Sequence, residues 1–133
     1  MRVFLDTNVV VSAVATRGLC ADLFAAILAE HELVLGETVL DEIRRVLGRK
    51  LRVQRATLEE LDGLLSSHAT VARAPAKSAI KGLDAADAAV VAEAVAGRAE
   101  VLVSGDQDLL KLADPPIPIV SPRGLWDLLR RAT

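Results

Sequence analysis

Short apolar runs that alternate with longer helix-like segments most constrain the fold of this 133-residue chain. Runs such as Arg2–Leu5 and Val101–Val103 are too short for a helix and consist largely of β-branched and large apolar residues, which buried strands favour. Between such runs, segments such as Thr38–Leu47 repeat apolar residues at helical spacing. Strands that alternate with helices predict an α/β fold with a central parallel sheet and helices on both faces.

The pattern places twelve elements within one predicted domain, residues 1–133, whose length is typical of a single domain. Four or five strands are expected in the sheet, from the segments Arg2–Leu5, Leu33–Leu35, Thr70–Ala72, Val101–Val103 and Pro118–Val120. Helical segments are expected at Asn8–Ala15, Leu19–Glu30, Thr38–Leu47, Leu58–Ser67, Asp84–Ala96, Asp108–Leu112 and Gly124–Arg130.

Composition indicates a cytoplasmic protein that does not enter a membrane. Hydrophobic residues make up 52% of the chain, which is enough for a sizeable core. No apolar run approaches the roughly 20 residues of a spanning helix, and Asp6 interrupts the first apolar run too early for a secretory leader. With a single cysteine, Cys20, no internal disulfide can form, which fits a reducing compartment.

The net charge of −2 neither excludes nor favours a nucleic-acid partner. If four of the 18 acidic residues hold a metal, the remaining 14 face 16 basic ones, which leaves +2 outside the site. Six basic residues lie between positions 44 and 55, and four of them are candidates to bind RNA phosphates: Arg44, Arg45, Arg49 and Lys50. The alternative is an ordinary solvated helix end, where cations complement the helix dipole.

Two aspartates follow predicted strands. Asp6 comes directly after Arg2–Leu5, and Asp106 comes three residues after Val101–Val103. In open parallel sheets, ligands bind beyond the carboxyl ends of the strands. If these two strands are neighbours, both carboxylates open onto the same edge of the sheet.

Two further acids belong to predicted helices. Glu42 lies beside the apolar stripe of its helix, where it can reach a crevice. Asp84 and Asp87 open an apolar helix, and Asp84 is well placed as its N-cap. Asp87 could be the partner in a capping box, but an unpaired charge inside so apolar a helix would be costly.

Convergence of Asp6, Glu42, Asp87 and Asp106 would require a cation. Two carboxylates about 5 Å apart repel by about 3 kcal/mol at an effective dielectric near 20. Several such pairs enforce proton uptake or the binding of a divalent ion. Ligands that are all oxygen favour Mg²⁺ or Mn²⁺ over Zn²⁺, so the pattern predicts a hydrolytic metal site.

Four acidic motifs in this order resemble the PIN-domain family, especially the VapC-like toxins of toxin–antitoxin pairs. The matching segments are Val3–Val9 with Asp6, Val39–Ile43 with Glu42, Asp84–Asp87 with Asp87, and Ser104–Leu110 with Asp106. Residues 119–122 also match the family's last strand and the start of its last helix. Ser104 stands where threonine is common in the family, and it keeps the hydroxyl.

The resemblance implies a PIN-like parallel sheet and Mg²⁺- or Mn²⁺-dependent cleavage of RNA by water, leaving 5′-phosphate and 3′-hydroxyl ends. Asp6, Glu42, Asp87 and Asp106 would hold the metal, while Asn8 and Ser104 would hold these carboxylates in place. Asp108 would be an extra ligand or the cap of the following turn. The family also implies a cognate antitoxin, laid across the active-site groove, and a homodimer.

Two other classes of function remain open. In a phosphoaspartyl phosphatase or receiver, Asp6 would be the nucleophile, but the phosphatase pattern places a second acid where this chain has Asn8, and the adjacent acids of a receiver are missing. A non-catalytic binding module would leave the gathered carboxylates without a chemical purpose.

Overall fold

A parallel sheet of five strands forms the centre of the computed structural model, which describes residues 1–75 and 78–131. The strands are β1 (Arg2–Leu5), β2 (Glu32–Gly36), β3 (Ala69–Ala72), β4 (Val101–Val103) and β5 (Ile119–Val120). Their order is β3-β2-β1-β4-β5, and every neighbouring pair is parallel. The predicted α/β class and the parallel sheet are confirmed, with five strands.

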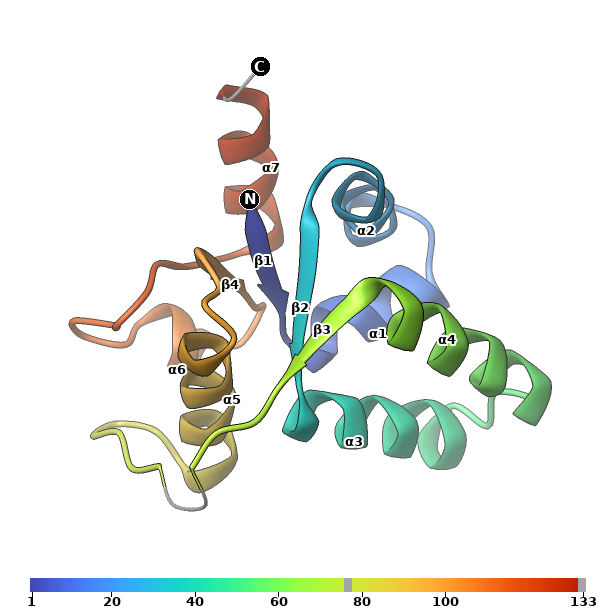
Figure 1. The fold of residues 1–133 in the computed structure, drawn as a ribbon, viewed down its shortest axis with the longest axis horizontal. Coiled ribbons are helices and arrows are strands. Elements are labelled where there is room, and N and C mark those ends of the chain that lie inside the picture. Colours follow the sequence, from blue (N-terminus) through green and yellow to red (C-terminus); the bar gives the residue numbers. More distant parts are fainter. Residues whose placement is uncertain (76–77, 132–133) are drawn as a thin grey trace.

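Helices cover both sides of this sheet, as the sequence predicted. Figure 1 shows α5 on one side and α1, α2 and α4 on the other. The helices are α1 (Thr7–Ala15), α2 (Leu19–Glu30), α3 (Glu37–Arg45), α4 (Arg55–His68), α5 (Ala85–Ala96), α6 (Gln107–Leu110) and α7 (Pro122–Arg131).

The region between α3 and α4 differs from the prediction. The predicted helix Thr38–Leu47 ends at Arg45 and continues as a π-helical turn, η1 (Val46–Lys50), in which the Leu51 N–H donates to the Val46 carbonyl over 3.0 Å. Helix α4 begins at Arg55, three residues before the predicted Leu58. The first turn of α4 is polar and exposed, so it carries no apolar periodicity from which its start could be read.

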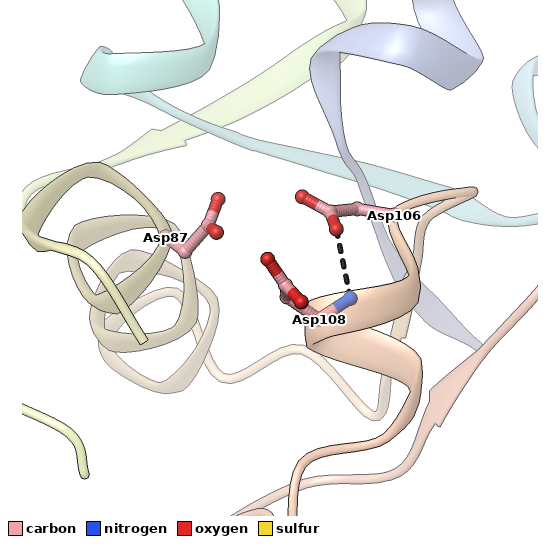
Figure 2. Close-up of side chains that lie close together, drawn as sticks. All are labelled: Asp87, Asp106 and Asp108. Carbon is pink, nitrogen blue, oxygen red and sulfur yellow. Dashed lines mark hydrogen bonds between the residues drawn. The ribbon is translucent and has the colours of Figure 1, made fainter. Parts of the chain in front are cut away.

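Strand order reverses at β1, which lies between β2 and β4. The chain leaves β1 into α1, β2 into α3 and β4 towards α6, so three helices begin at the carboxyl edge of these neighbouring strands. At that edge, Figure 2 shows the start of α5 facing the start of α6. Ligand sites in open parallel sheets occur at such a reversal.

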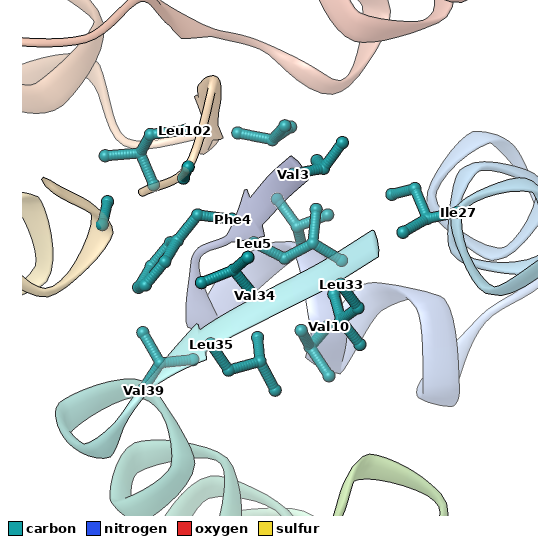
Figure 3. Close-up of a cluster of buried hydrophobic side chains, with 14 of the residues drawn as sticks. Val3, Phe4, Leu5, Val10, Ile27, Leu33, Val34, Leu35, Val39 and Leu102 are labelled. Carbon is teal, nitrogen blue, oxygen red and sulfur yellow. The ribbon is translucent and has the colours of Figure 1, made fainter. Parts of the chain in front are cut away.

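The core lies on both faces of the sheet, and Figure 3 shows its centre around β1 and β2. Phe4, Leu5, Val34 and Leu102 are fully buried. Helix α5 packs directly against the sheet, because a Cβ on Gly97 at its end would lie 2.6 Å from Val34. The core therefore fixes the positions of β1, β2 and α5, which border the carboxyl edge.

Among the described residues, no single helix is long and apolar enough to cross a membrane. Helices α1 and α2 reach that length and composition only as a pair, and they are bent by 103° at the break between them.

Candidate active site

The four acids expected to converge line one pocket of about 370 Å³ at the carboxyl edge of the sheet. Asp6 comes from the end of β1, Glu42 from α3, Asp87 from α5 and Asp106 from the start of α6. Thr7, Asn8, Val11, Val46 and Val90 complete the lining. The convergence that strand order and helix periodicity predicted is therefore present in the structure.

Asp6 is the most buried of the four acids, with 7% of its surface exposed. Its backbone N–H donates to the Val103 carbonyl over 2.9 Å, which extends the pairing of β1 with β4 up to the site. Oδ1 accepts a 2.8 Å hydrogen bond from the Thr7 N–H, so Asp6 also caps α1. Oδ2 accepts from the Ser104 hydroxyl over 2.6 Å and from Asn8 Nδ2 over 3.2 Å.

Burial raises the pKa of Asp6 above its ordinary value. The hydrogen bonds from Ser104 and Thr7 oppose this effect, whereas the nearby carboxylates of Glu42 and Asp106 add to it. Asp6 is thus a buried acid whose ionised form needs positive charge nearby.

Asn8 and Ser104, the predicted supporting residues, connect α1 to the loop after β4. The Ser104 hydroxyl accepts from the Asp106 N–H over 3.0 Å and lies 3.4 Å from Asn8 Nδ2. Asn8 Oδ1 accepts from the Gly105 N–H over 3.0 Å. These bonds fix Asp6 and Asp106 relative to each other, as outer hydrogen bonds do for metal-binding carboxylates.

Asp87, Asp106 and Asp108 form a tight group, the three-acid cluster, in which one oxygen of each lies within 4.8 Å of the others. Figure 2 shows the three carboxylates pointing toward one another from α5 and α6. Asp106 Oδ1 accepts a 2.9 Å hydrogen bond from the Asp108 N–H and so caps α6. Since the cap of that turn is Asp106, the carboxylate of Asp108 is left free to join the cluster.

Asp84 has the capping role that the sequence predicted, because its Oδ1 accepts from the Asp87 N–H over 2.8 Å. The pKa of Asp87 is raised to about 6, first by burial and then by repulsion from Asp106, Asp84, Asp6 and Asp108. A carboxyl with so high a pKa is unstable in its ionised form, and a bound divalent cation would stabilise that form.

The donor set fits Mg²⁺ or Mn²⁺. Every side-chain donor of the three-acid cluster is a carboxylate oxygen, and Asp6 adds another to the same pocket. Hard divalent cations take such ligands, whereas none of the described residues lining the pocket is the histidine or cysteine that Zn²⁺ sites commonly use.

Glu42 lies on the α3 wall of the pocket and outside the three-acid cluster. It is half-buried, and its charge contributes to the raised pKa of Asp6. Val46, one turn further along, lines the same wall. The predicted orientation of Glu42 toward a crevice is therefore observed, while its role as a metal ligand stays a prediction.

Sequence reasoning missed Glu93, which is only 2% exposed within α5. Its Oε1 accepts a 2.7 Å hydrogen bond from the Thr38 N–H, so it caps the start of α3 from another helix. Gly36 makes room for this contact, because a Cβ there would lie 2.7 Å from the Glu93 carboxyl. Glu93 Oε2 and the Thr7 hydroxyl are buried and have no hydrogen-bond partner within the described part of the chain.

None of the four predicted RNA-binding residues lines the acidic pocket. Arg44 pairs with Asp62 over 3.2 Å and with Asp41 over 3.7 Å. Arg45 and Arg49 line a separate hollow of about 320 Å³ together with Arg44 and Asp41. Lys50 is exposed. Their contact with RNA stays a prediction.

Comparison with known proteins identifies the fold and the family. Among solved structures, the chain is similar to the crystal structure of VapBC2 from Rickettsia felis bound to a DNA fragment from their promoter. The TM-score is 0.63 at 16% identity, over 91% of this chain and 98% of the other, so the likeness shows a shared fold. No curated protein matches the sequence. The family model of the PIN domain matches residues 2–108, a span that includes all five acids of the site, and the chain therefore belongs to the PIN-domain family.

Proposed function

We propose that this protein is a metal-dependent endoribonuclease, the toxin of a toxin–antitoxin pair, and that it acts in the cytoplasm. PIN domains are nucleases, and the chain belongs to that family. The observation that carries the proposal is the three-acid cluster of Asp87, Asp106 and Asp108 beside the buried Asp6. Such a site suits the hydrolysis of a phosphodiester bond, whose negative charge a cation must offset.

Asp6, Glu42, Asp87, Asp106 and Asp108 are the residues that would hold Mg²⁺ or Mn²⁺ in this pocket. When bound, such a cation lowers the pKa of water and offsets charge on the scissile phosphate. Ser104 and Asn8 hold Asp6 Oδ2 in a fixed orientation through their hydrogen bonds. Glu42, which lies outside the three-acid cluster, would contribute its carboxylate to that cation from the α3 wall of the pocket.

Water is the proposed nucleophile, and the products are a 5′-phosphate and a 3′-hydroxyl. Attack by the 2′-hydroxyl of RNA requires an acid and a base near the scissile bond, a task often performed by histidines. His31 ends α2 and His68 ends α4, and neither lines the acidic pocket. The alternative in which Asp6 is a phosphoryl acceptor gains no support, because Asn8 stands where the phosphatase pattern has its second acid, and its amide donates to Asp6 Oδ2.

The proposed partner is a cognate antitoxin that covers the acidic pocket, and the proposed state of the free protein is a homodimer. Two observations support this proposal. The chain belongs to the PIN family, and it shares its fold with VapBC2, whose crystal structure is bound to a promoter DNA fragment. The pocket is lined by acids and by Val11, Val46 and Val90, so a covering segment would need both basic and apolar side chains.

The test is cleavage of end-labelled single-stranded RNA by the purified protein with Mn²⁺ or Mg²⁺. We expect cleavage that stops in EDTA, is abolished by Asp6→Asn and leaves 5′-phosphate ends. Asp84→Asn, which keeps the helix cap, is the matched control and should retain activity. Failure to cleave any RNA, together with no metal binding in calorimetry, would leave a binding module as the better explanation.

A further inference from the structure

A second hollow, the lysine pocket, adjoins the three-acid cluster. It has a volume of about 480 Å³ and is lined by Lys81, Gly82, Asp108, Lys111, Leu112 and Ala113. Asp108 both lines the lysine pocket and belongs to the three-acid cluster, so the two sites share one residue. Among the described residues that line it, the two lysines carry positive charge and Asp108 carries negative charge.

Both lysines are free to bind an anion. Lys81 and Lys111 are exposed, and neither forms an ion pair with any residue in the ranges 1–75 and 78–131. An unpaired ammonium is a compact charge with three donors, which suits a phosphate oxygen.

The backbone holds each lysine in a defined place. Lys81 stands at the second position of a turn that the Leu83 N–H closes on the Ile80 carbonyl over 3.1 Å. Gly82, at the third position, has φ +93°, which is the conformation that a type II turn requires there. Lys111 follows α6, and its N–H donates to the Gln107 carbonyl over 2.9 Å.

We propose that the lysine pocket binds a backbone phosphate of the RNA strand, next to the phosphate being cleaved. This inference rests on the proposed nuclease function. The four carboxylates of the acidic pocket, together with Asp108, repel a polyanion even when a divalent ion is bound, so the strand needs positive charge where it leaves the metal site. Lys81 and Lys111 supply that charge on the side of Asp108.

The basic run in residues 44–50 is less well placed for this task. Arg44 is engaged by Asp41 and Asp62, and the hollow lined by Arg45 and Arg49 contains no residue of the three-acid cluster. The lysine pocket, by contrast, shares Asp108 with the cluster that would hold the metal. A strand that passes Asp108 therefore lies next to Lys81 and Lys111, and not next to the basic run.

The test compares two double variants in binding labelled single-stranded RNA, in Ca²⁺ and under conditions where the wild type leaves the RNA uncut. We expect K81A/K111A to weaken binding on the order of tenfold at low salt, and the slope of log affinity against log salt to fall by about 0.7, as for the loss of one phosphate contact on a single strand. K81R/K111R should restore binding, because the charge is kept. Affinity for Mn²⁺, measured by calorimetry on each variant, should stay within about twofold of the wild type.

R45A/R49A is the matched comparison, with the same loss of two charges. A larger loss of affinity in this variant than in K81A/K111A would overturn the lysine pocket in favour of the basic run. Unchanged RNA binding by K81A/K111A, in a protein that still cleaves RNA with Mn²⁺, would also overturn it and leave the nuclease function standing. If the wild type neither binds nor cleaves RNA, the proposed function fails and the phosphate site fails with it.

Discussion

The Ser104 hydroxyl donates a 2.6 Å hydrogen bond to Asp6 Oδ2 across 98 residues of sequence. Ser104 is fully buried and Asp6 is 7% exposed, so no solvent competes strongly for this contact. The same hydroxyl accepts from the Asp106 N–H. One serine thus binds the carboxylate of Asp6 and the backbone of Asp106, the two acids that follow neighbouring strands.

Ser104→Ala should weaken both the fold and the cation site. Loss of a buried hydrogen bond to a carboxylate costs about 1–3 kcal/mol in the free energy of unfolding. The Ser104 bond lowers the pKa of Asp6, so its removal should raise that pKa further and reduce affinity for Mn²⁺. Denaturant unfolding and calorimetry measure the two effects. Ser104→Thr keeps the hydroxyl and should retain most of the affinity; equal losses in both variants would contradict this role for the hydroxyl.

Without metal, stability should fall as pH rises, because the pKa of Asp87 is raised from 3.8 to about 6. Between these values the folded state binds more protons than the unfolded state, so the contribution of Asp87 is full at low pH and is lost as pH rises through about 6. Unfolding in EDTA over this range measures it. The effect should shrink in Asp87→Asn, and a variant with the wild-type pH profile would show that Asp87 does not titrate in this window.

Affinity for Mn²⁺ should show the opposite trend with pH. The cation needs ionised carboxylates, and protons compete for Asp87 below about pH 6. We therefore expect calorimetry to show weaker binding and greater proton release as the buffer is made more acidic through this range. Addition of Mn²⁺ at neutral pH should raise the melting temperature, and EDTA should reverse that rise. Affinity independent of pH would argue against Asp87 as a ligand.

Asp108→Asn should lower affinity for Mn²⁺ by about tenfold or more, because the variant removes one carboxylate from the three-acid cluster. Asp84→Asn is matched in charge, and asparagine keeps the helix cap, so its affinity should change little. Calorimetry on the two variants and the wild type makes the comparison. Equal effects would mean that the overall negative charge matters and the position of Asp108 does not.

Glu93→Ala should destabilise the protein by about 1–3 kcal/mol, because it leaves the Thr38 N–H without its partner. Glu93→Gln keeps an acceptor there and should cost less. Gly36→Ala places a Cβ 2.7 Å from the Glu93 carboxyl and should displace it.

If Glu93 acts on the site by positioning α3, Glu93→Ala should lower the affinity of the wild type for Mn²⁺. The same substitution should change that affinity little in a protein that already carries Glu42→Gln. If the losses of Mn²⁺ affinity from the two substitutions add in the double variant, Glu93 does not act through Glu42.

The position of Asp6 and Asp106 could be predicted because it follows from chain order. An acid that follows a buried parallel strand lies at the carboxyl edge of the sheet. Both β1 and β4 could be predicted because they are short apolar runs. Asp108 could not be assigned in advance. Whether it capped the turn or joined the cluster depended on which aspartate accepted from the backbone, and both had suitable spacing.

Glu93 and Arg44 form contacts between helices that sequence patterns do not predict. The partner of Glu93, Thr38, lies 55 residues away on another helix, so an acid in an apolar segment gave no sign of its purpose. Arg44 stood in a basic run that suggested RNA binding, yet its ion pair with Asp62 joins α3 to α4. Local periodicity predicts which side of a helix is buried, but contacts between elements depend on the tertiary arrangement.

Because β1 pairs with both β2 and β4, β1 cannot complete its pairing until β4 has been synthesised. At about 5–20 residues per second, the roughly 100 residues between Asp6 and Asp106 take about 5–20 s to synthesise. A chain that stops before β4 keeps Asp6 but has neither Ser104 nor Asp106. The proposed nuclease site therefore cannot assemble until synthesis has passed β4 and the loop that follows it.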